Sequence, residues 1–343
     1  MLIIIHHLVV DGVSWRILLE DLLTAYTQLS QGKEITLPPK TTSFKHWAER
    51  LKEYAKSEMP KEELSYWLSQ STTLVHRLAI DNPDGTNIIA SSQNVSVYLN
   101  VEETQALLKK VPPVYNTHIN DLLLAALLQA LSQWTGKNSL LIDLEGHGRE
   151  ELFDDVDTSR TVGWFTTIFP VSLNLEESNN HGNILRSVKE QLRRIPNHGI
   201  GYGLLRYMKE DIEIAEKLRE LPQAEISFNY LGQFDQVLPE PSPFVPAKES
   251  MGSTVSPFGN RRYLLEINCG VIEGQLQIVW TYSENIHRQV TIENLAKKYL
   301  DSLRELIDHC LSENAGGYTP SDFPEANLTQ KELDQIMIEL NES

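Results

Sequence analysis

The segment NTHINDLLLAALLQALSQWTG at residues 116–136 constrains the fold more strongly than any other part of the chain. Its apolar side chains cover nearly the whole circumference of a predicted helix, with Thr117 as the expected N-cap and Gly136 as the expected end. A helix that is apolar all round must be buried among other elements. Its longest wholly apolar run, at 122–128, is too short to span a bilayer, so a globular core is expected to cover it.

Helices and strands are predicted along the rest of the chain without the regular repeat of a βαβ fold. The sequence therefore predicts an α+β fold with a large mixed sheet. Helical spacing predicts further helices at 13–31, within 44–70, at 101–111 and at 291–310. Strands are predicted at 94–100, at the start of 139–150, and at 166–175, 224–232, 265–273 and 274–284.

Three segments are expected to lack regular structure. Residues 81–93 are turn-rich and polar, and they are the candidate domain boundary. Residues 195–207 contain three glycines in five positions, but no strand leads into them and their spacing does not fit a dinucleotide-binding motif. We expect there a loop that lets the backbone approach a neighbour or a ligand. The Pro-rich residues 237–248 predict a long loop that interrupts the sheet.

Composition excludes several classes of protein. The net charge is −17, and the sequence contains no local basic patch of the kind that binds nucleic acid or an anionic membrane. Cys269 and Cys310 lack metal-ligand spacing, so we expect buried free thiols and no metal site. The apolar opening run is broken by polar residues and is no signal peptide, which favours a soluble, cytoplasmic protein.

The stretch MLIIIHHLVVDGVSWRIL places two adjacent histidines in an apolar, β-branched run. This run predicts a buried strand that leads directly into a helix. Since adjacent side chains of a strand point to opposite faces, His6 and His7 would differ in role, one in packing and one facing a cavity. The alternative is a pair of core histidines with backbone partners. Asp11 is expected to form the turn or to cap the helix.

Glu145 closes an apolar strand and is followed by GHGRE. A carboxylate at a strand end beside glycines can reach into a cleft, where apolar surroundings raise its pKa and suit it to acid–base catalysis. The alternative is a solvated loop glutamate paired with Arg149. Trp164 and Phe165 follow Gly163 and are candidates either for a channel wall or for core positions.

Five motifs occur in one order: HHxxxDGVSW at 6–15, EGHGRE at 145–150, TVGWFTxxFPV at 161–171, GxGYGxLRY at 199–207 and FNYLGQ at 228–233. Together they resemble the epimerization domains of nonribosomal peptide synthetases, which belong to the condensation-domain superfamily. The resemblance runs from the first residue to about residue 310. The VSW sequence, the glutamate that opens EGHGRE and the FNYLGQ stretch point to the epimerizing branch.

The resemblance implies a fold of two chloramphenicol-acetyltransferase-like lobes arranged in a V. Residues 1–88 would be the remainder of the N-terminal lobe, which carries HHxxxDG, and residues 89–315 the C-terminal lobe. In the family a substantial stretch precedes HHxxxDG, whereas five residues precede it here. The resemblance therefore implies an N-terminally truncated chain with an incomplete front lobe, unpaired strand edges and exposed apolar surface.

Residues 316–343 resemble an interdomain linker or a docking segment that leads to a short acidic helix. The alternative for this tail is an unstructured segment.

The implied reaction inverts the α-carbon of an aminoacyl or peptidyl group held as a thioester on the phosphopantetheine arm of a carrier protein. Such a reaction removes a weakly acidic α-proton, stabilises the enolate and returns a proton to the opposite face. The thioester carbonyl accepts the electrons, so the resemblance implies no cofactor of the chain's own. The implied partners are an upstream peptidyl carrier protein, an adenylation domain and a downstream condensation domain.

By position, His7 matches the family's catalytic histidine and Glu145 its acid–base carboxylate. Either of the two could remove the proton while the other stabilises the enolate. Residues implied to line the substrate tunnel are Trp15, Trp164, Phe165, Tyr202, Asn229 and Tyr230, and Tyr202 is also a candidate proton donor.

His6, Asp11 and Gly12 match positions that are structural in the family, and Asp11 would be bridged to either Arg16 or Arg149. Two other functions remain as alternatives to epimerization. One is a condensation-type acyltransferase that forms amide bonds, and the other is an inactive fragment or interaction platform.

Overall fold

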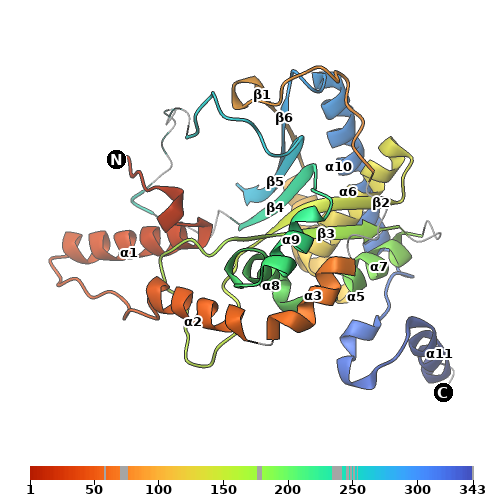
Figure 1. Cartoon of the computed structure of the whole chain (residues 1–343), viewed down its shortest axis with the longest axis horizontal. Helices are drawn as coiled ribbons and strands as arrows, with labels where there is room; N and C mark the ends of the chain where they lie inside the picture. The colour runs from red at the N-terminus through yellow and green to blue at the C-terminus, as the bar shows by residue number, and fades with distance from the viewer. Residues whose placement is uncertain are drawn as a thin grey trace.

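The computed structural model describes residues 1–57, 59–69, 76–175, 180–233, 242–244, 247, 249, 252 and 254–341, with the backbone alone for 59–62. A six-stranded sheet forms its centre, in the order β1-β6-β5-β4-β2-β3 (Figure 1). The strand β4 runs parallel to both β2 and β5, and the other neighbouring pairs are antiparallel. The prediction of an α+β fold with a mixed sheet is therefore confirmed. The strands are β1 (Ser92–Tyr98), β2 (Ser139–Gly146), β3 (Thr167–Asn174), β4 (Ile226–Gln233), β5 (Leu265–Ile272) and β6 (Gln275–Ser283).

One face of the sheet carries three helices that enclose the main core. These are α6 (Ile119–Thr135), α7 (His181–Arg193) and α10 (Gln289–Leu311), and they contact one another as well as the strands. Every α6 residue from Asp121 to Leu131 is buried, as the apolar circumference of this helix predicts.

The ends of α6 follow local rules, with one correction to the predicted start. The helix stops at Gly136, whose φ of 68° is a left-handed conformation that glycine adopts easily. Its N-cap is His118 and not Thr117. Asp121 decides the start, because its Oδ2 accepts a hydrogen bond of 2.7 Å from the backbone N–H of His118.

The remaining helices lie in the connections and at the two ends of the chain. The prediction of a loop at 195–207 is wrong: these residues form three short helical segments, because the glycines adopt helical or left-handed geometry there. The remaining helices are η1 (His7–Val9), α1 (Gly12–Ser30), α2 (Phe44–Lys56), α3 (Met59–Ser69), η3 (Ile89–Ser91), α4 (Val101–Gln105), η4 (Ala106–Lys110), α5 (Pro112–Tyr115), η5 (Pro196–Gly199), α8 (Ile200–Gly203), η6 (Leu204–Met208), α9 (Ile212–Glu220), η8 (Pro320–Asp322), η9 (Pro324–Ala326) and α11 (Gln330–Asn341).

The predicted buried strand around the two histidines is wrong. Residues 1–6 have no regular structure, and His7–Val9 form a single 3-10 turn. A strand needs a hydrogen-bonding neighbour, and within the described residues the one sheet does not include this segment. Six of its apolar side chains are exposed: Met1, Leu2, Ile3, Ile4, Leu8 and Val9.

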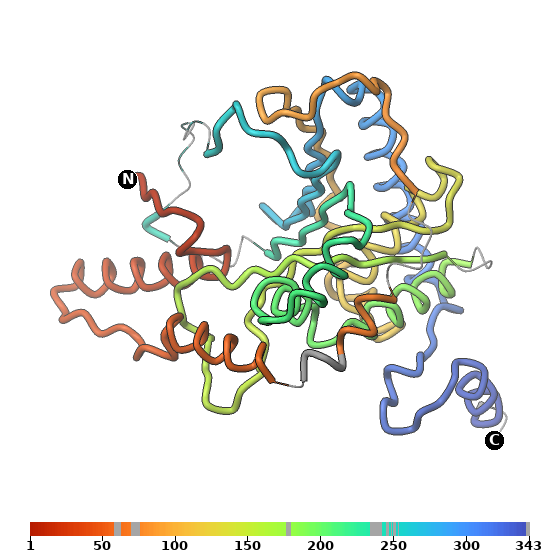
Figure 2. Tube along the Cα trace, in the orientation of Figure 1, coloured from red at the N-terminus to blue at the C-terminus, as the bar shows by residue number. Residues whose placement is uncertain are grey.

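The long connection between β2 and β3 joins the N-terminal helices to the sheet. Figure 2 shows the yellow-green chain of residues 147–166 passing beside α1 and α2. The backbone N–H of Thr42 donates to the carbonyl of Asp157 at 3.0 Å, and Arg160 pairs with Glu20 and Asp21 of α1. The helices of residues 1–88 are thus bound to this connection, although they add no strand to the sheet.

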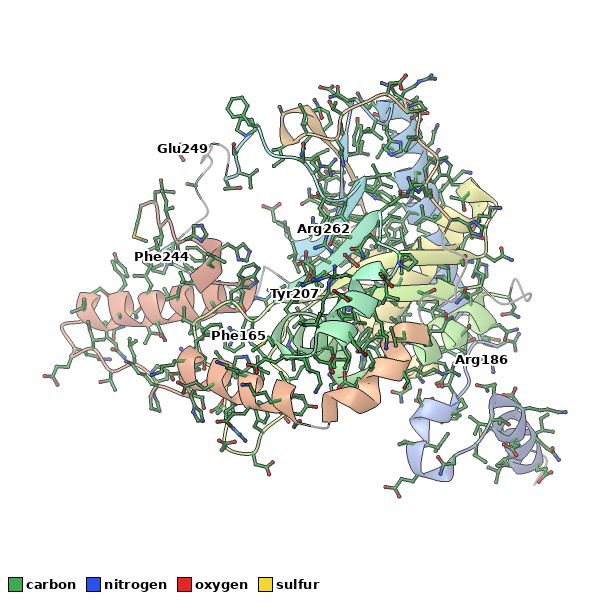
Figure 3. The ribbon with its side chains drawn as sticks, viewed as in Figure 1. Phe165, Arg186, Tyr207, Phe244, Glu249 and Arg262 are labelled. Carbon is green, nitrogen blue, oxygen red and sulfur yellow. The ribbon has the colours of Figure 1, made fainter. Side chains whose placement is uncertain are left out.

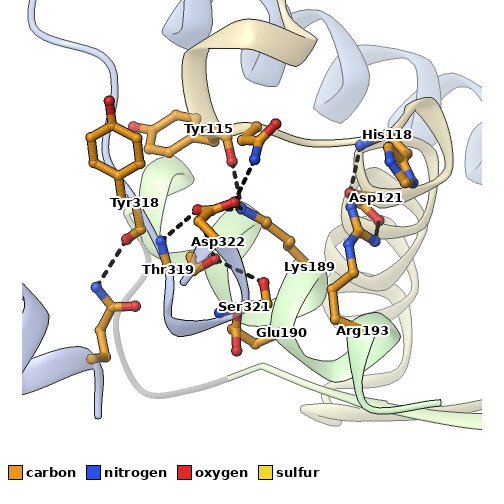
Figure 4. A network of polar contacts seen from close by, with 12 residues as sticks. Tyr115, His118, Asp121, Lys189, Glu190, Arg193, Tyr318, Thr319, Ser321 and Asp322 are labelled. Atoms are coloured by element: carbon orange, nitrogen blue, oxygen red, sulfur yellow. Dashed lines mark hydrogen bonds and ion pairs between the residues drawn. The ribbon is translucent and has the colours of Figure 1, made fainter. Parts of the chain in front are cut away.

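The C-terminal tail packs on the lobe through a buried ion pair (Figure 4). Lys189 Nζ lies 2.7 Å from both carboxylate oxygens of Asp322 and donates to the carbonyl of Tyr115 at 2.9 Å. The backbone N–H of Ser321 donates to Glu190 at 3.1 Å. Residues 318–326 are therefore attached to the lobe, and the predicted short helix is α11.

Two predictions from the sequence are not tested by the described residues. The Pro-rich segment 237–248 lies largely outside the described residues. The division at residues 88 and 315 stays a prediction.

Among the described helices, none has the length and apolar character that a membrane crossing requires.

Candidate active site

Glu145 lies near the end of β2 and is held by the neighbouring strand. The parallel pairing of β2 with β4 sets Leu144 opposite Phe228, so Glu145 and Asn229 are neighbours in register. Asn229 Nδ2 donates a hydrogen bond of 2.6 Å to Glu145 Oε2. The alternative of a solvated Glu145 paired with Arg149 is wrong, because Arg149 bonds elsewhere.

The surroundings of Glu145 favour its protonated form. Burial raises the pKa of this carboxyl, positive charge on His7 lowers it, and the nearby carboxylate of Glu266 raises it. The net direction is upward. A carboxyl group with a raised pKa can hold and release a proton closer to neutral pH than an exposed glutamate can.

A second carboxyl lies two residues earlier on the same face of β2. Asp143 is buried, and its Oδ2 accepts hydrogen bonds from Tyr263 Oη at 2.7 Å and from Arg262 Nη2 at 2.9 Å. Burial raises the pKa of Asp143, and burial together with Asp143 raises that of Tyr263. Sequence analysis missed this group, although the period of two along β2 places Asp143 on the face of Glu145.

The two histidines have different roles, but neither is buried. His6 Nδ1 accepts a hydrogen bond of 3.1 Å from the backbone N–H of Leu8 and so caps the 3-10 turn. The His7 ring lies against Trp164, with ring centroids 5.4 Å apart and planes inclined at 53°. The prediction of burial fails because the segment is a turn and not a strand within a sheet.

Asp11 anchors the start of α1 to the lobe that carries Glu145. Its Oδ1 accepts from the backbone N–H of Ser14 at 2.6 Å, which makes Asp11 the N-cap, and its Oδ2 accepts from Phe165 N–H at 3.1 Å. Arg149 Nη2 lies 3.2 Å from Asp11 Oδ1. Of the two arginines predicted as partners of Asp11, Arg149 is therefore the one that binds it. Arg16 donates instead to the carbonyl of Leu231 at 2.8 Å.

The Arg149 side chain is buried and gathers several loop atoms. It donates to the carbonyls of Thr158 and Thr161 at 2.7 and 2.8 Å, and to Ser14 Oγ at 3.1 Å. Its guanidinium lies 3.9 Å from the centre of the Phe165 ring. The arginine of EGHGRE thus connects the HHxxxDG segment to the turn that follows Glu145.

The aromatic tunnel candidates do not form one group. Phe165 is 4% exposed and packs edge-on against Phe44 in a small core beside α2, whereas Trp164 is 40% exposed beside His7. Figure 3 shows Phe165 between the N-terminal helices and the sheet. Tyr202 is buried against Trp67.

The other tunnel candidates also differ in their surroundings. The hydroxyl of Tyr202 accepts a hydrogen bond from Arg206. Trp15 is half-buried on α1, and Tyr230 packs on the main core while its neighbour Asn229 reaches Glu145. Gly12 is exposed and begins α1. Whether these residues line a tunnel stays a prediction, but Asn229 is the candidate that directly contacts Glu145.

Among the residues that the structure describes, no cluster of three or more His, Cys, Asp or Glu side chains could hold a metal ion. The site contains the half-buried carboxyl of Glu145, which the Asn229 amide holds, and the imidazole of His7, whose positive form acts on that carboxyl electrostatically. Such an arrangement can exchange protons with a weakly acidic C–H group.

The chain belongs to the condensation-domain family, whose model it matches over residues 1–329. It is 52% identical over 339 residues to one of the linear gramicidin synthase subunits of Brevibacillus parabrevis, covering 98% of this chain and 4% of that protein. It is 41% identical to gramicidin S synthase 1 of Brevibacillus brevis, of which it covers 31%. The chain thus spans a small part of the curated relatives it matches.

The fold is similar to the solved epimerization domain from the third module of tyrocidine synthetase B. The TM-score is 0.83 at 40% identity, with coverage of 90% of this chain and 68% of that one. The SgcC5 protein from Streptomyces globisporus shares the fold at 14% identity and a TM-score of 0.66.

Proposed function

We propose that this chain carries the site that inverts the α-carbon of an aminoacyl or peptidyl thioester presented by a carrier protein. The observation that carries the proposal is the Glu145 carboxyl, which is half-buried, has a raised pKa and is oriented by Asn229 at 2.6 Å. The likeness to the tyrocidine synthetase epimerization domain supports the same reaction.

The reaction needs proton transfer on both faces of one carbon. The α-C–H bond breaks, its proton passes to one of the two groups, and the electron pair moves onto the thioester oxygen to form an enolate. A proton then returns to the opposite face, and the carbonyl reforms. Glu145 and His7 are the two groups, and the thioester itself accepts the charge, so no cofactor of the chain's own takes part.

The implied partners belong to this proposal as well. A peptidyl carrier protein would deliver the substrate on its phosphopantetheine arm, and the adenylation and condensation domains would act before and after this step. The large multidomain relatives support such an assembly, since the chain matches 4% and 7% of two different linear gramicidin synthase proteins.

The test follows α-deuterium uptake. The chain is mixed in heavy water with an L-aminoacyl carrier-protein thioester, and both deuterium at the α-carbon and the D/L ratio of the released acid are measured. We expect uptake with inversion, and Glu145→Gln should lower the rate by at least about a hundredfold, since Gln cannot exchange a proton at neutral pH. The control Glu216→Gln alters an exposed α9 residue and should keep the rate.

Two results would overturn the proposal. Amide formation with a second acyl carrier protein, without α-deuterium uptake, would favour the condensation-type acyltransferase. No uptake and no amide formation would identify the chain as an inactive fragment or interaction platform.

A further inference from the structure

The turn between α7 and α8 has an unusual backbone. Asn197, His198 and Gly199 follow one another with φ values of 43°, 49° and 88°, all in the left-handed region. Residues with a side chain rarely adopt this region, and two such residues in a row persist only where their surroundings hold them. The neighbours that contact this turn must therefore hold its backbone in the left-handed conformation.

A buried glutamate on α3 holds one side of the turn. Glu63 is 6% exposed, and its Oε1 accepts a hydrogen bond of 2.6 Å from Asn197 Nδ2. Its Oε2 lies 3.5 Å from Trp67 Nε1, one helical turn further along α3. A Cβ atom on Gly201 would overlap the Glu63 carboxylate, so this glycine provides the space that the carboxylate occupies.

The other side of the turn rests on the strand end that carries Glu145. A Cβ on Gly199 would overlap the Phe169 ring, and a Cβ on Gly146 would lie 3.4 Å from the same ring and 3.7 Å from the carbonyl oxygen of His198. Phe169 therefore lies between the left-handed turn and Gly146. Gly146 is the residue directly after Glu145.

A second contact joins the turn to the EGHGRE segment. His198 Nδ1 lies 2.6 Å from Glu150 Oε2, and Glu150 Oε1 lies 3.6 Å from His147 Nδ1. The two turns are thus connected by side chains as well as by packing. A continuous set of contacts runs from α3, through the turn, to Gly146 and the rest of the EGHGRE segment that follows Glu145.

We propose that Glu63 is a positioning residue for Glu145, acting through Asn197 and the left-handed turn, and this rests on the proposed function of Glu145. Glu63 touches none of the groups that would react. Its hydrogen bond keeps the turn in a backbone conformation that Asn197 and His198 would otherwise leave. This turn then keeps Phe169 and Gly146 in place, so that the Glu145 side chain stays half-buried and within reach of Asn229.

The test compares three variants with the wild-type chain. Glu63→Ala removes the acceptor, Glu63→Gln keeps one oxygen for Asn197, and Asn197→Ala removes the donor while keeping a residue with a side chain at this left-handed position. The matched control is Glu103→Ala, which removes a glutamate that is equally well bonded, to Arg304 at 2.8 Å and to the N–H of Asn100 at 2.8 Å. Glu103 lies on α4, in contact with neither turn.

Two readouts are taken on each variant. The first is the pH titration of the Glu145 carboxyl carbon by carbon-13 NMR, its signal being assigned by its loss in Glu145→Gln. The second is the kcat and KM for α-deuterium uptake. For Glu63→Ala and Asn197→Ala we expect the Glu145 titration to move to lower pH, and kcat to fall by about tenfold to a hundredfold at unchanged KM.

Glu63→Gln should restore most of the wild-type titration and rate, and Glu103→Ala should change neither. If Glu63→Ala does not fold, Asn197→Ala decides the question by the same readouts. An unchanged titration in these variants, or an equal shift in Glu103→Ala, would overturn the positioning role. A wild-type chain without deuterium uptake would refute the proposed function instead, and the NMR titration alone would then decide the role of Glu63.

Discussion

At the scale of single residues, Asp11 has two structural roles: the local sequence predicts one, and for the other the family resemblance left two arginines open. A turn-forming aspartate before a helix is a common N-cap, and Asp11 caps α1 in this way. The same carboxylate also accepts from the buried guanidinium of Arg149. The capping role is local and could be predicted, whereas the ion pair joins residues 138 positions apart.

This ion pair leads to a stability prediction. Replacing Arg149 by Met leaves the buried Asp11 carboxylate without its cation and two carbonyls without their donor. We expect the free energy of unfolding to fall by about 3 kcal/mol, since breaking one side of a buried pair leaves an uncompensated charge. Urea unfolding followed by tryptophan fluorescence measures the change.

The control is Arg219→Met, because Arg219 is exposed on α9. It should change the free energy of unfolding by no more than about 0.5 kcal/mol. Equal stability of the Arg149→Met and Arg219→Met variants would contradict the structural role assigned to Arg149.

At the scale of elements, the junction of β6 and α10 contains a buried imidazole. His287 lies edge-on to Trp134, and neither of its ring nitrogens has a hydrogen-bond partner in the described part of the chain. Burial lowers the pKa of His287, Asp81 at 3.9 Å opposes that change, and Arg261 adds to it. The folded state therefore favours the neutral form of His287.

This histidine predicts how stability depends on pH. Because the folded pKa lies below the unfolded value of about 6.5, the unfolded chain binds more protons as the pH falls. The stabilisation is present above pH of about 6.5 and is lost as the pH falls toward the folded pKa. His118 and His309 have pKa values lowered by burial and act in the same direction.

The measurement is the urea midpoint between pH 7.5 and 5.5. We expect a decrease for the wild type and a smaller decrease for His287→Gln, since Gln does not titrate. The exposed His76→Gln variant serves as the control and should keep the wild-type slope. A wild-type slope in His287→Gln as well would show that this residue does not contribute.

At the scale of the whole molecule, the tail is joined to the lobe by Lys189 and Asp322. Both side chains are at most 5% exposed. Burial raises the pKa of Asp322, but hydrogen bonds from Lys189, Thr319 and Asn116, together with the positive charge of Lys189, lower it by more, so the net direction is downward and the charged carboxylate is favoured. The attachment continues to α11, where Arg186 lies 3.4 Å from Asp334 and Leu333 is buried.

Removing the lysine should release the tail. In Lys189→Met we expect the backbone amides of residues 318–326 to exchange with heavy water at least about tenfold faster, because the buried carboxylate loses its cation. Peptide-resolved hydrogen exchange by mass spectrometry measures this. The amides of α6 and the exposed-site variant Lys137→Met are the controls, and unchanged exchange at 318–326 would contradict the attachment.

Much of the architecture follows from local patterns in the sequence. The apolar circumference of α6 and the left-handed Gly136 each depend on residues within a few positions of one another. Periodicity and capping chemistry act over that range, so these elements could be predicted. The motif order likewise indicated the family, which the match over residues 1–329 confirms.

Only the tertiary structure decided which groups meet. Arg149 and not Arg16 binds Asp11, Asn229 holds Glu145, and Glu63 supports the left-handed turn, each across a long separation in the chain. The apolar run around His7 is a turn, because a strand forms only beside a partner. Burial, hydrogen-bond partners and pKa depend on neighbours that packing brings together, and the local pattern of a segment does not contain that information.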